Sequence, residues 1–131
     1  MTSFFFYGTL CHAPLLELVL GRRPVTEPAS LADHAVHLAR GEAFPVIVPR
    51  PGATATGILV HDLTPGDVAR LDFYEGGFDC FTRSLEIGAR RIPARVYFAD
   101  PGRWEPGAPW DLGDWAAAHG AVVLATAADF M

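Results

Sequence analysis

Two short segments combine residue types that could bind an anion or move a proton. The first, Tyr7-Gly8-Thr9-Leu10, is expected to lie between a strand and a helix. Backbone N–H groups at the start of a helix have no partner within it and carry partial positive charge, so this loop could hold a carboxylate. The alternative is a tight turn around a buried tyrosine, because a single glycine in a turn is common.

The second segment runs from Leu71 to Gly76 and contains the carboxylate of Glu75. On a helix, Val68, Leu71, Asp72 and Glu75 share one face, and the two apolar residues turn that face toward the interior. Burial and the negative end of the helix dipole both raise the pKa of a carboxyl group. A raised pKa suits a general acid/base near neutral pH. The alternative is a solvated glutamate at a frayed helix end.

Other catalytic chemistries have weaker support. His34 and His37 face opposite sides of a strand, and the sequence contains neither HExxH nor CxxC, so we expect no metal site. No serine lies in a GxSxG-like elbow. The chain has no lysine, which excludes a Walker A or Schiff-base lysine. Cys11 and Cys80 are the only cysteines, and we expect both to be reduced thiols.

Length and composition favour one folded domain, residues 1–131, in the cytoplasm. The chain has 131 residues, of which 50% are hydrophobic and 19% charged, so it can build a core without the help of disulfides or metal ions. Its net charge of −5 argues against nucleic acid and anionic membranes as partners. The apolar N-terminus, Phe4-Phe5-Phe6, has no basic region before it and does not resemble a signal peptide.

The predicted elements are mainly strands. We expect strands at residues 3–7, 34–38, 44–48, 57–63, 83–87 and 93–98. Helices are expected at residues 15–20, at 64–75 behind a Thr64 N-cap, and from about residue 111. The proline-containing segments 22–30, 49–52 and 101–110 are expected to be a connector, a turn and a surface loop. The order of elements favours an α+β fold with a small, mainly antiparallel β-barrel and peripheral helices.

Several motifs together resemble the gamma-glutamylcyclotransferase-like family. The resemblance covers roughly residues 3–98, and its most specific feature pairs the Tyr-Gly-Thr-Leu segment with the later Asp-x-x-Glu-Gly. The matching segments are Phe6-Tyr7-Gly8-Thr9-Leu10, Gly57-Ile58-Leu59, Leu71-Asp72-Phe73-Tyr74-Glu75-Gly76, Arg83 and Ala94-Arg95-Val96-Tyr97.

The resemblance implies a barrel with a pocket at one end and an enzyme that releases 5-oxoproline from a small gamma-glutamyl amine or peptide. Glu75 would be the general acid/base. Tyr7, Gly8, Thr9 and Leu10 would hold the glutamyl group, mainly through backbone groups, and Arg83 would also bind substrate. The substrate's own α-amine closes the ring, so neither a metal nor a cofactor is needed.

Arg83 and the expected apolar neighbours of Glu75 have opposite effects on its pKa. Desolvation should come from Phe73, Tyr74, Phe78 and Phe81. A guanidinium within about 4–6 Å would lower the pKa instead. We expect desolvation to dominate, because an arginine that serves a substrate carboxylate should point away from the base.

One departure from the family pattern keeps a second function open. Members usually carry a tyrosine two residues before the arginine matched to Arg83, and this chain has Phe81 there. A non-catalytic binding or accessory domain is therefore the alternative to an enzyme. The segment from residue 101 onward resembles a bacterial subgroup in which this domain often precedes a Nudix hydrolase domain. The chain could thus stand alone or form the front part of a longer protein with such a partner.

Overall fold

In the computed structural model, which describes residues 2–76, 78–100 and 102–131, five strands close into a barrel. The strands are β1 (Thr2–Phe6), β2 (Thr26–Ala39), β3 (Pro45–Leu63), β4 (Asp79–Ile87) and β5 (Arg90–Phe98). The order around the barrel is β3-β1-β5-β4-β2, and β2 pairs with β3 to close it. Among the described pairs of these five strands, β1–β5 is parallel and the others are antiparallel. The predicted mainly antiparallel barrel is confirmed.

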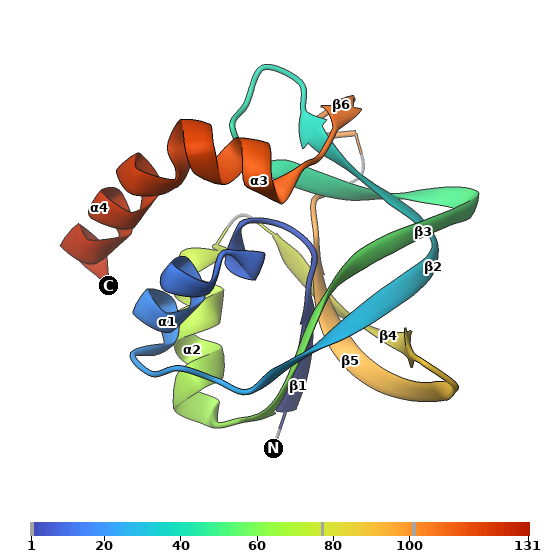
Figure 1. The fold of residues 1–131 in the computed structure, drawn as a ribbon, viewed down its shortest axis with the longest axis horizontal. Helices are drawn as coiled ribbons and strands as arrows, with labels where there is room; N and C mark the ends of the chain where they lie inside the picture. Colours follow the sequence, from blue (N-terminus) through green and yellow to red (C-terminus); the bar gives the residue numbers. More distant parts are fainter. Residues whose placement is uncertain (1, 77, 101) are drawn as a thin grey trace.

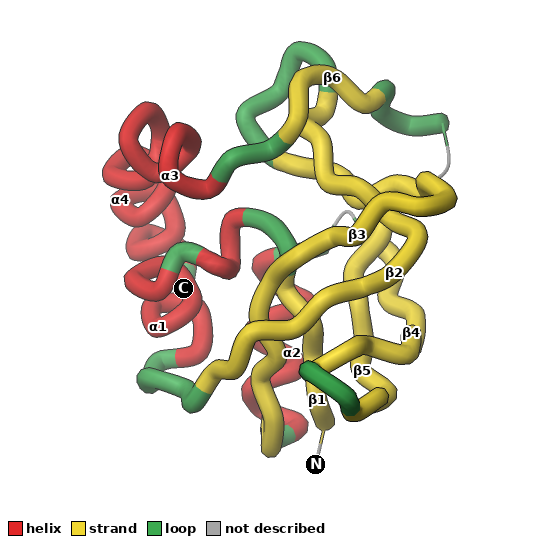
Figure 2. The backbone as a smooth tube through the Cα atoms, turned by 45° about the vertical axis from the view of Figure 1, so that its right-hand side comes forward, coloured by secondary structure: helices red, strands yellow, loops and turns green. Residues whose placement is uncertain are grey.

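The helices gather on one side of this barrel (Figures 1 and 2). They are α1 (Ala13–Leu20), α2 (Pro65–Tyr74), α3 (Leu112–Trp115) and α4 (Ala121–Phe130), with the short 3-10 helix η1 (Thr9–Cys11) and the π-helical segment η2 (Ala116–Gly120). Helix α1 packs against both α2 and α4. No helix in the described part of the chain is long and apolar enough to cross a membrane.

The alternation of side chains along β1 separates two hydrophobic cores. Phe5 points into the barrel, where it packs with strand residues that include Leu59, Leu85 and Val96. Phe4 and Phe6 point the other way and pack with the helices. The main members of this second core are Leu10, Leu15, Leu16, Val19, Val60, Leu63, Leu71, Tyr97 and Trp115. Strand β1 thus joins the barrel to the helical layer.

Helix α2 begins where its sequence predicts. Thr64 Oγ1 accepts a hydrogen bond from the Asp67 backbone N–H at 3.0 Å, and Asp67 Oδ2 accepts from the Thr64 N–H at 2.9 Å. These reciprocal bonds form a capping box. Leu71 is fully buried, and Glu75 is the C-cap, one residue beyond the last helical residue, Tyr74. The capped start therefore sets the position of Glu75.

Three proline-rich predictions were wrong in detail. Part of the expected connector is strand, because β2 begins at Thr26. The expected turn lies within β3, where the pairing with β2 shifts beside Asp33 and Gly52, both with positive φ. The Gly52 N–H donates to Asp33 Oδ1 at 3.0 Å, so this irregularity bends the strand pair without ending it. The expected surface loop contains β6 (Pro106–Pro109), which extends the sheet beside β2.

Candidate active site

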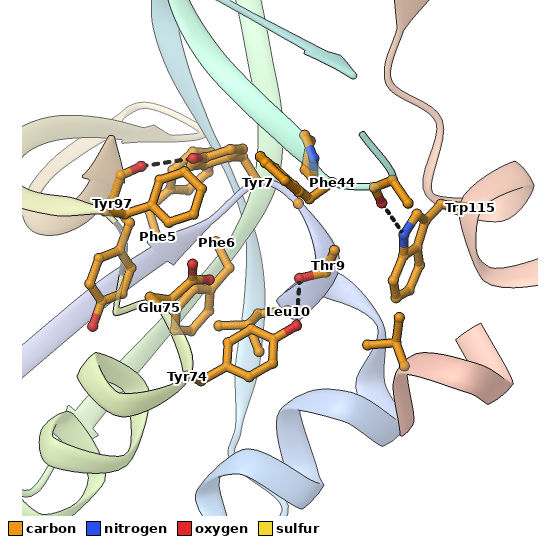
Figure 3. Close-up of a pocket in the computed structure, with 15 residues that line it drawn as sticks. Phe5, Phe6, Tyr7, Thr9, Leu10, Phe44, Tyr74, Glu75, Tyr97 and Trp115 are labelled. Atoms are coloured by element: carbon orange, nitrogen blue, oxygen red, sulfur yellow. Dashed lines mark hydrogen bonds between the residues drawn. The ribbon is translucent and has the colours of Figure 1, made fainter. Parts of the chain in front are cut away.

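A pocket of about 350 Å³ lies where the end of β1, the end of α2 and the β2–β3 connection meet (Figure 3). Four predicted binding residues, Tyr7, Gly8, Thr9 and Leu10, line it together with Glu75. The other lining residues are Phe5, Phe6, Ala43, Phe44, Pro45, Tyr74, Phe78, Tyr97, Trp115 and Val123. The structure thus brings the two chemistry-bearing segments of the sequence to one cavity.

The Tyr7–Leu10 loop is fixed by contacts with three distant segments. The Tyr7 hydroxyl donates to the Tyr97 carbonyl oxygen at 2.8 Å. Thr9 Oγ1 and the Tyr74 hydroxyl lie 3.1 Å apart in a hydrogen bond, which ties the loop to the end of α2. A Cβ at Gly8 would collide with the ring of Pro45. Glycine is required at position 8 because the Pro45 ring approaches the backbone so closely.

The loop also begins η1, which leaves backbone donors near the cavity. The first bond of η1 runs from the Cys11 N–H to the Gly8 carbonyl oxygen at 2.9 Å. The N–H groups of Thr9 and Leu10 precede this bond and have no acceptor within the helix. Both residues line the pocket. We predict that these N–H groups point into the same cavity as the Glu75 carboxylate.

Glu75 reaches the pocket from the C-terminal end of α2. Its N–H donates to the Leu71 carbonyl oxygen at 2.8 Å, and its own carbonyl oxygen accepts from the Phe78 N–H at 2.9 Å. Within the described residues, no hydrogen bond or ion pair engages its carboxylate. Burial raises the pKa of Glu75 from its ordinary value of 4.5 to about 7. The group can therefore both accept and donate a proton near neutral pH.

Three tyrosines surround this carboxyl group, and each hydroxyl already has a partner. The Tyr97 hydroxyl donates to Asp72 Oδ1 at 2.6 Å, while the hydroxyls of Tyr7 and Tyr74 make the bonds described above. Burial raises the pKa of all three phenols, that of Tyr74 to about 12, and the charge of Glu75 adds to each increase. The phenols are therefore neutral near pH 7, and Glu75 is the group in the pocket that titrates there.

The apolar surroundings expected for Glu75 are confirmed for two residues and wrong for two. Tyr74 and Phe78 line the pocket. Phe73 is 61% exposed and meets the ring of Phe130 edge to face, while Phe81 is 48% exposed. Phe73 immediately precedes Tyr74 on α2 and therefore points to a different side of the helix.

Arg83, the remaining predicted binding residue, does not line this pocket, and its role in substrate binding stays a prediction. Its guanidinium carbon lies 5.0 Å from the ring centre of Phe98 and 5.5 Å from that of Phe81. Alternation along β4 places Arg83 on the same face as Leu85, which belongs to the core inside the barrel. Phe81 lies outside the pocket as well, so the tyrosine hydroxyl missing at that position removes no polar group from the lining.

Part of the pocket wall had no signal in the sequence, namely Phe5, Ala43, Phe44, Pro45, Trp115 and Val123. Phe44 and Phe78 lie against Trp104, with ring centres 5.0 and 5.7 Å from it. Trp115 forms another part of the wall, and its Nε1–H donates to the Ala43 carbonyl oxygen at 2.8 Å. Phe6, Tyr74 and Tyr97 had a sequence signal, because they belong to the matching motifs, and Phe78 was expected beside Glu75. The described residues contain no group of three or more His, Cys, Asp or Glu side chains placed to hold a metal ion.

Comparison with known proteins shows the family to which this barrel and pocket belong. A family model described as gamma-glutamyl cyclotransferase, AIG2-like, matches residues 4–117. The chain is therefore a member of the gamma-glutamyl cyclotransferase, AIG2-like family. AIG2-like protein D of Arabidopsis thaliana is 31% identical over 75 residues, which are 57% of this chain. The match covers 49% of that relative, so the chain spans about half of its length.

Solved structures share the fold at low sequence identity. A solution structure of an Arabidopsis thaliana protein has a TM-score of 0.70 and 20% identity, and the match covers 95% of this chain and 78% of that one. A structure named gamma-glutamyl cyclotransferase also has a TM-score of 0.70, with 15% identity, covering 96% of this chain and 85% of that one. At these identities the likeness establishes the fold alone.

Proposed function

We propose that this protein is an enzyme that releases 5-oxoproline from a small gamma-glutamyl amine or peptide. The observation that carries the proposal is the unpaired carboxyl group of Glu75, which has a pKa of about 7 and shares one pocket with the Tyr7–Leu10 loop. Family membership supports the same reaction class. The loop would hold the α-carboxylate of the glutamyl group through its backbone N–H groups.

The reaction is an intramolecular acyl transfer. The α-nitrogen of the substrate attacks its own γ-carbonyl carbon, a new C–N bond closes the five-membered ring, and the bond to the leaving nitrogen breaks. Starting from the ammonium form, the attacking nitrogen loses two protons in all, and the leaving nitrogen gains two to depart as an ammonium ion. Glu75 would pass these protons one at a time, as base before attack and as acid when the C–N bond breaks.

The remaining requirement is positioning. The pocket must hold the amine and the carbonyl carbon in near-attack geometry, which can contribute several kcal/mol to the rate enhancement. The hydrogen bonds of Tyr7 and Thr9 fix the loop that would do this. This reaction uses the substrate's own amine and carbonyl group and the carboxyl group of Glu75.

The direct test is 5-oxoproline release from a panel of gamma-glutamyl dipeptides and amines. We expect turnover of at least one member by the wild-type protein. Glu75→Gln is the matched control, because its amide is nearly isosteric but cannot exchange the proton. A wild-type protein that binds members of the panel without turning any over would instead support the non-catalytic alternative.

A further inference from the structure

The pocket wall away from Glu75 is apolar, and this property restricts the part of the substrate that leaves. Figure 3 shows Glu75 on the side of Tyr97 and Phe6, with Trp115 on the opposite side of the pocket. The glutamyl group must lie near Glu75, since its amine exchanges protons with that residue. The leaving amine then extends past Phe78, which lies beside Glu75, toward the wall formed by Phe44, Trp115 and Val123.

The polar groups of the pocket's aromatic residues are already paired within the protein. The Trp115 N–H is bonded to the Ala43 carbonyl oxygen, and the tyrosine hydroxyls are bonded to Tyr97, Thr9 and Asp72. These residues present their ring surfaces to the cavity. A substituent that enters this wall therefore meets mainly carbon atoms.

Charge leads to the same conclusion. Of the described residues that line the pocket, none is an arginine or a histidine, and Glu75 is the one carboxylic acid. A carboxylate on the part of the leaving group that contacts this wall would lose hydration with no cation among the lining residues and with Glu75 in the same cavity. An unpaired buried anion is strongly unfavourable, so this wall selects against an anionic leaving group.

The aromatic cluster of Phe44, Phe78 and Trp104 gives this wall its shape. Phe44 and Trp104 meet edge to face with an interplanar angle of 84°, and Phe78 stacks on Trp104 at 24°. Trp104 supports both rings from outside the lining and is itself covered by the Arg103 guanidinium at 4.4 Å. Aromatic rings held in this way offer edges and faces to an incoming apolar group.

We propose that the leaving group is an apolar amine that carries an aromatic ring and no carboxylate. The proposal rests on the cyclotransferase function proposed above and names its substrate class. Such a substrate carries a neutral, bulky substituent on its leaving nitrogen.

Four substrates separate the effect of the aromatic ring from the effect of the carboxylate. Gamma-glutamyl phenethylamide and gamma-glutamylphenylalanine share the ring and differ by the carboxylate. Gamma-glutamyl methylamide and gamma-glutamylglycine give the same comparison without the ring. We expect kcat/KM for the phenethylamide to be at least about tenfold above the values for the methylamide and for gamma-glutamylphenylalanine.

The Phe44→Ala variant tests whether the aromatic wall causes the preference for the phenethylamide. It should lower the ratio of phenethylamide to methylamide kcat/KM severalfold. Phe130→Ala, which removes an exposed aromatic ring outside the pocket lining, should leave that ratio unchanged. Thermal unfolding would verify that both variants fold.

The outcomes distinguish this proposal from the function on which it rests. Turnover of all four substrates with equal efficiency, or a preference for the two that carry a carboxylate, would overturn the leaving-group proposal and leave the cyclotransferase function standing. Turnover of none of them or of the wider panel would overturn both.

Discussion

Two carboxylates at opposite ends of α2 have opposite environments. Asp67, in the first turn, accepts a hydrogen bond from Arg22 at 2.7 Å and completes the capping box with Thr64. These partners, Arg22 foremost, lower the pKa of Asp67. Glu75, at the other end, has no such partner among the residues described, and burial raises its pKa to about 7. One carboxylate stabilises the helix, and the other retains a proton that chemistry can use.

The largest expected effect is the loss of activity in Glu75→Gln. General acid/base groups contribute about 10²–10⁴-fold, so the 5-oxoproline release rate should fall by that factor while the circular dichroism spectrum stays unchanged. The same substitution should change the pH dependence of stability. A variant that keeps nearly the full rate would show that Glu75 is not the proton carrier.

Stability should depend on pH in opposite directions at the two ends. The Glu75 pKa is raised on folding, so its contribution to stability is fully present below pH 4.5 and is lost as the pH rises to about 7, by on the order of 3 kcal/mol. The Asp67 pKa is lowered, so its contribution is present above its ordinary pKa of 3.8 and is lost as the pH falls below that value. Urea unfolding of the wild type and of Glu75→Gln between pH 3 and 8 would isolate the Glu75 contribution to the free energy of unfolding. The variant should lack the decrease in stability above pH 4.5.

Asp67→Asn should have the converse phenotype to Glu75→Gln. It removes the ion pair with Arg22 and weakens the capping box, at a cost of about 1–2 kcal/mol because Arg22 is half-exposed. Activity should persist at temperatures where the variant is folded, since Asp67 lies at the far end of α2. Urea unfolding at pH 7 and an assay of 5-oxoproline release would check both expectations. A large loss of rate in a folded Asp67→Asn protein would contradict the division of roles.

A smaller effect is expected for Tyr97→Phe. The Tyr97–Asp72 hydrogen bond links β5 to α2 three residues before Glu75, so it helps to position the acid. Its loss should cost about 1 kcal/mol and lower the melting temperature by about 3–6 °C. If the bond positions Glu75, the pH profile of kcat/KM should also shift, whereas a merely structural role would change the melting temperature alone.

The smallest effect is expected for Arg83→Ala. Because Arg83 lies outside the pocket, kcat/KM should stay within about twofold of the wild type, or about 0.4 kcal/mol in the activation barrier. A tenfold loss measured with any gamma-glutamyl substrate would mean that Arg83 reaches the substrate after all.

The sequence predicted best those features that depend on neighbouring residues. The start and end of α2 follow from Thr64, Asp67 and helical periodicity, and the loop after β1 was found in the same way. Segments 26–33 and 49–56 were not predicted as strands, because proline and glycine are ordinarily turn signals. In the structure, both segments belong to one long strand pair, β2–β3. The pairing is irregular at Asp33 and Gly52, which both have positive φ.

The candidate site was predictable only in part, because some of its residues meet through contacts between distant segments of the chain. Glu75 and Tyr7–Leu10 carry local patterns, so they could be singled out. Phe44, Trp115 and Val123 come from segments far apart in the chain and meet only when the barrel closes and the last helices pack against it. Arg83 was matched by its place in a motif, which does not specify that β4 contributes to the pocket, and none of the described lining residues comes from β4.

The most direct test of the central claim is the titration of the Glu75 carboxyl group by NMR of side-chain ¹³C-labelled glutamate. Comparison with Glu75→Gln would assign the resonance. We expect a pKa of about 7 in the free protein, because burial disfavours the charged carboxylate. A pKa at or below the ordinary value of 4.5 would mean that the group is ionised and stabilised at neutral pH, and Glu75 would then be a structural carboxylate like Asp67.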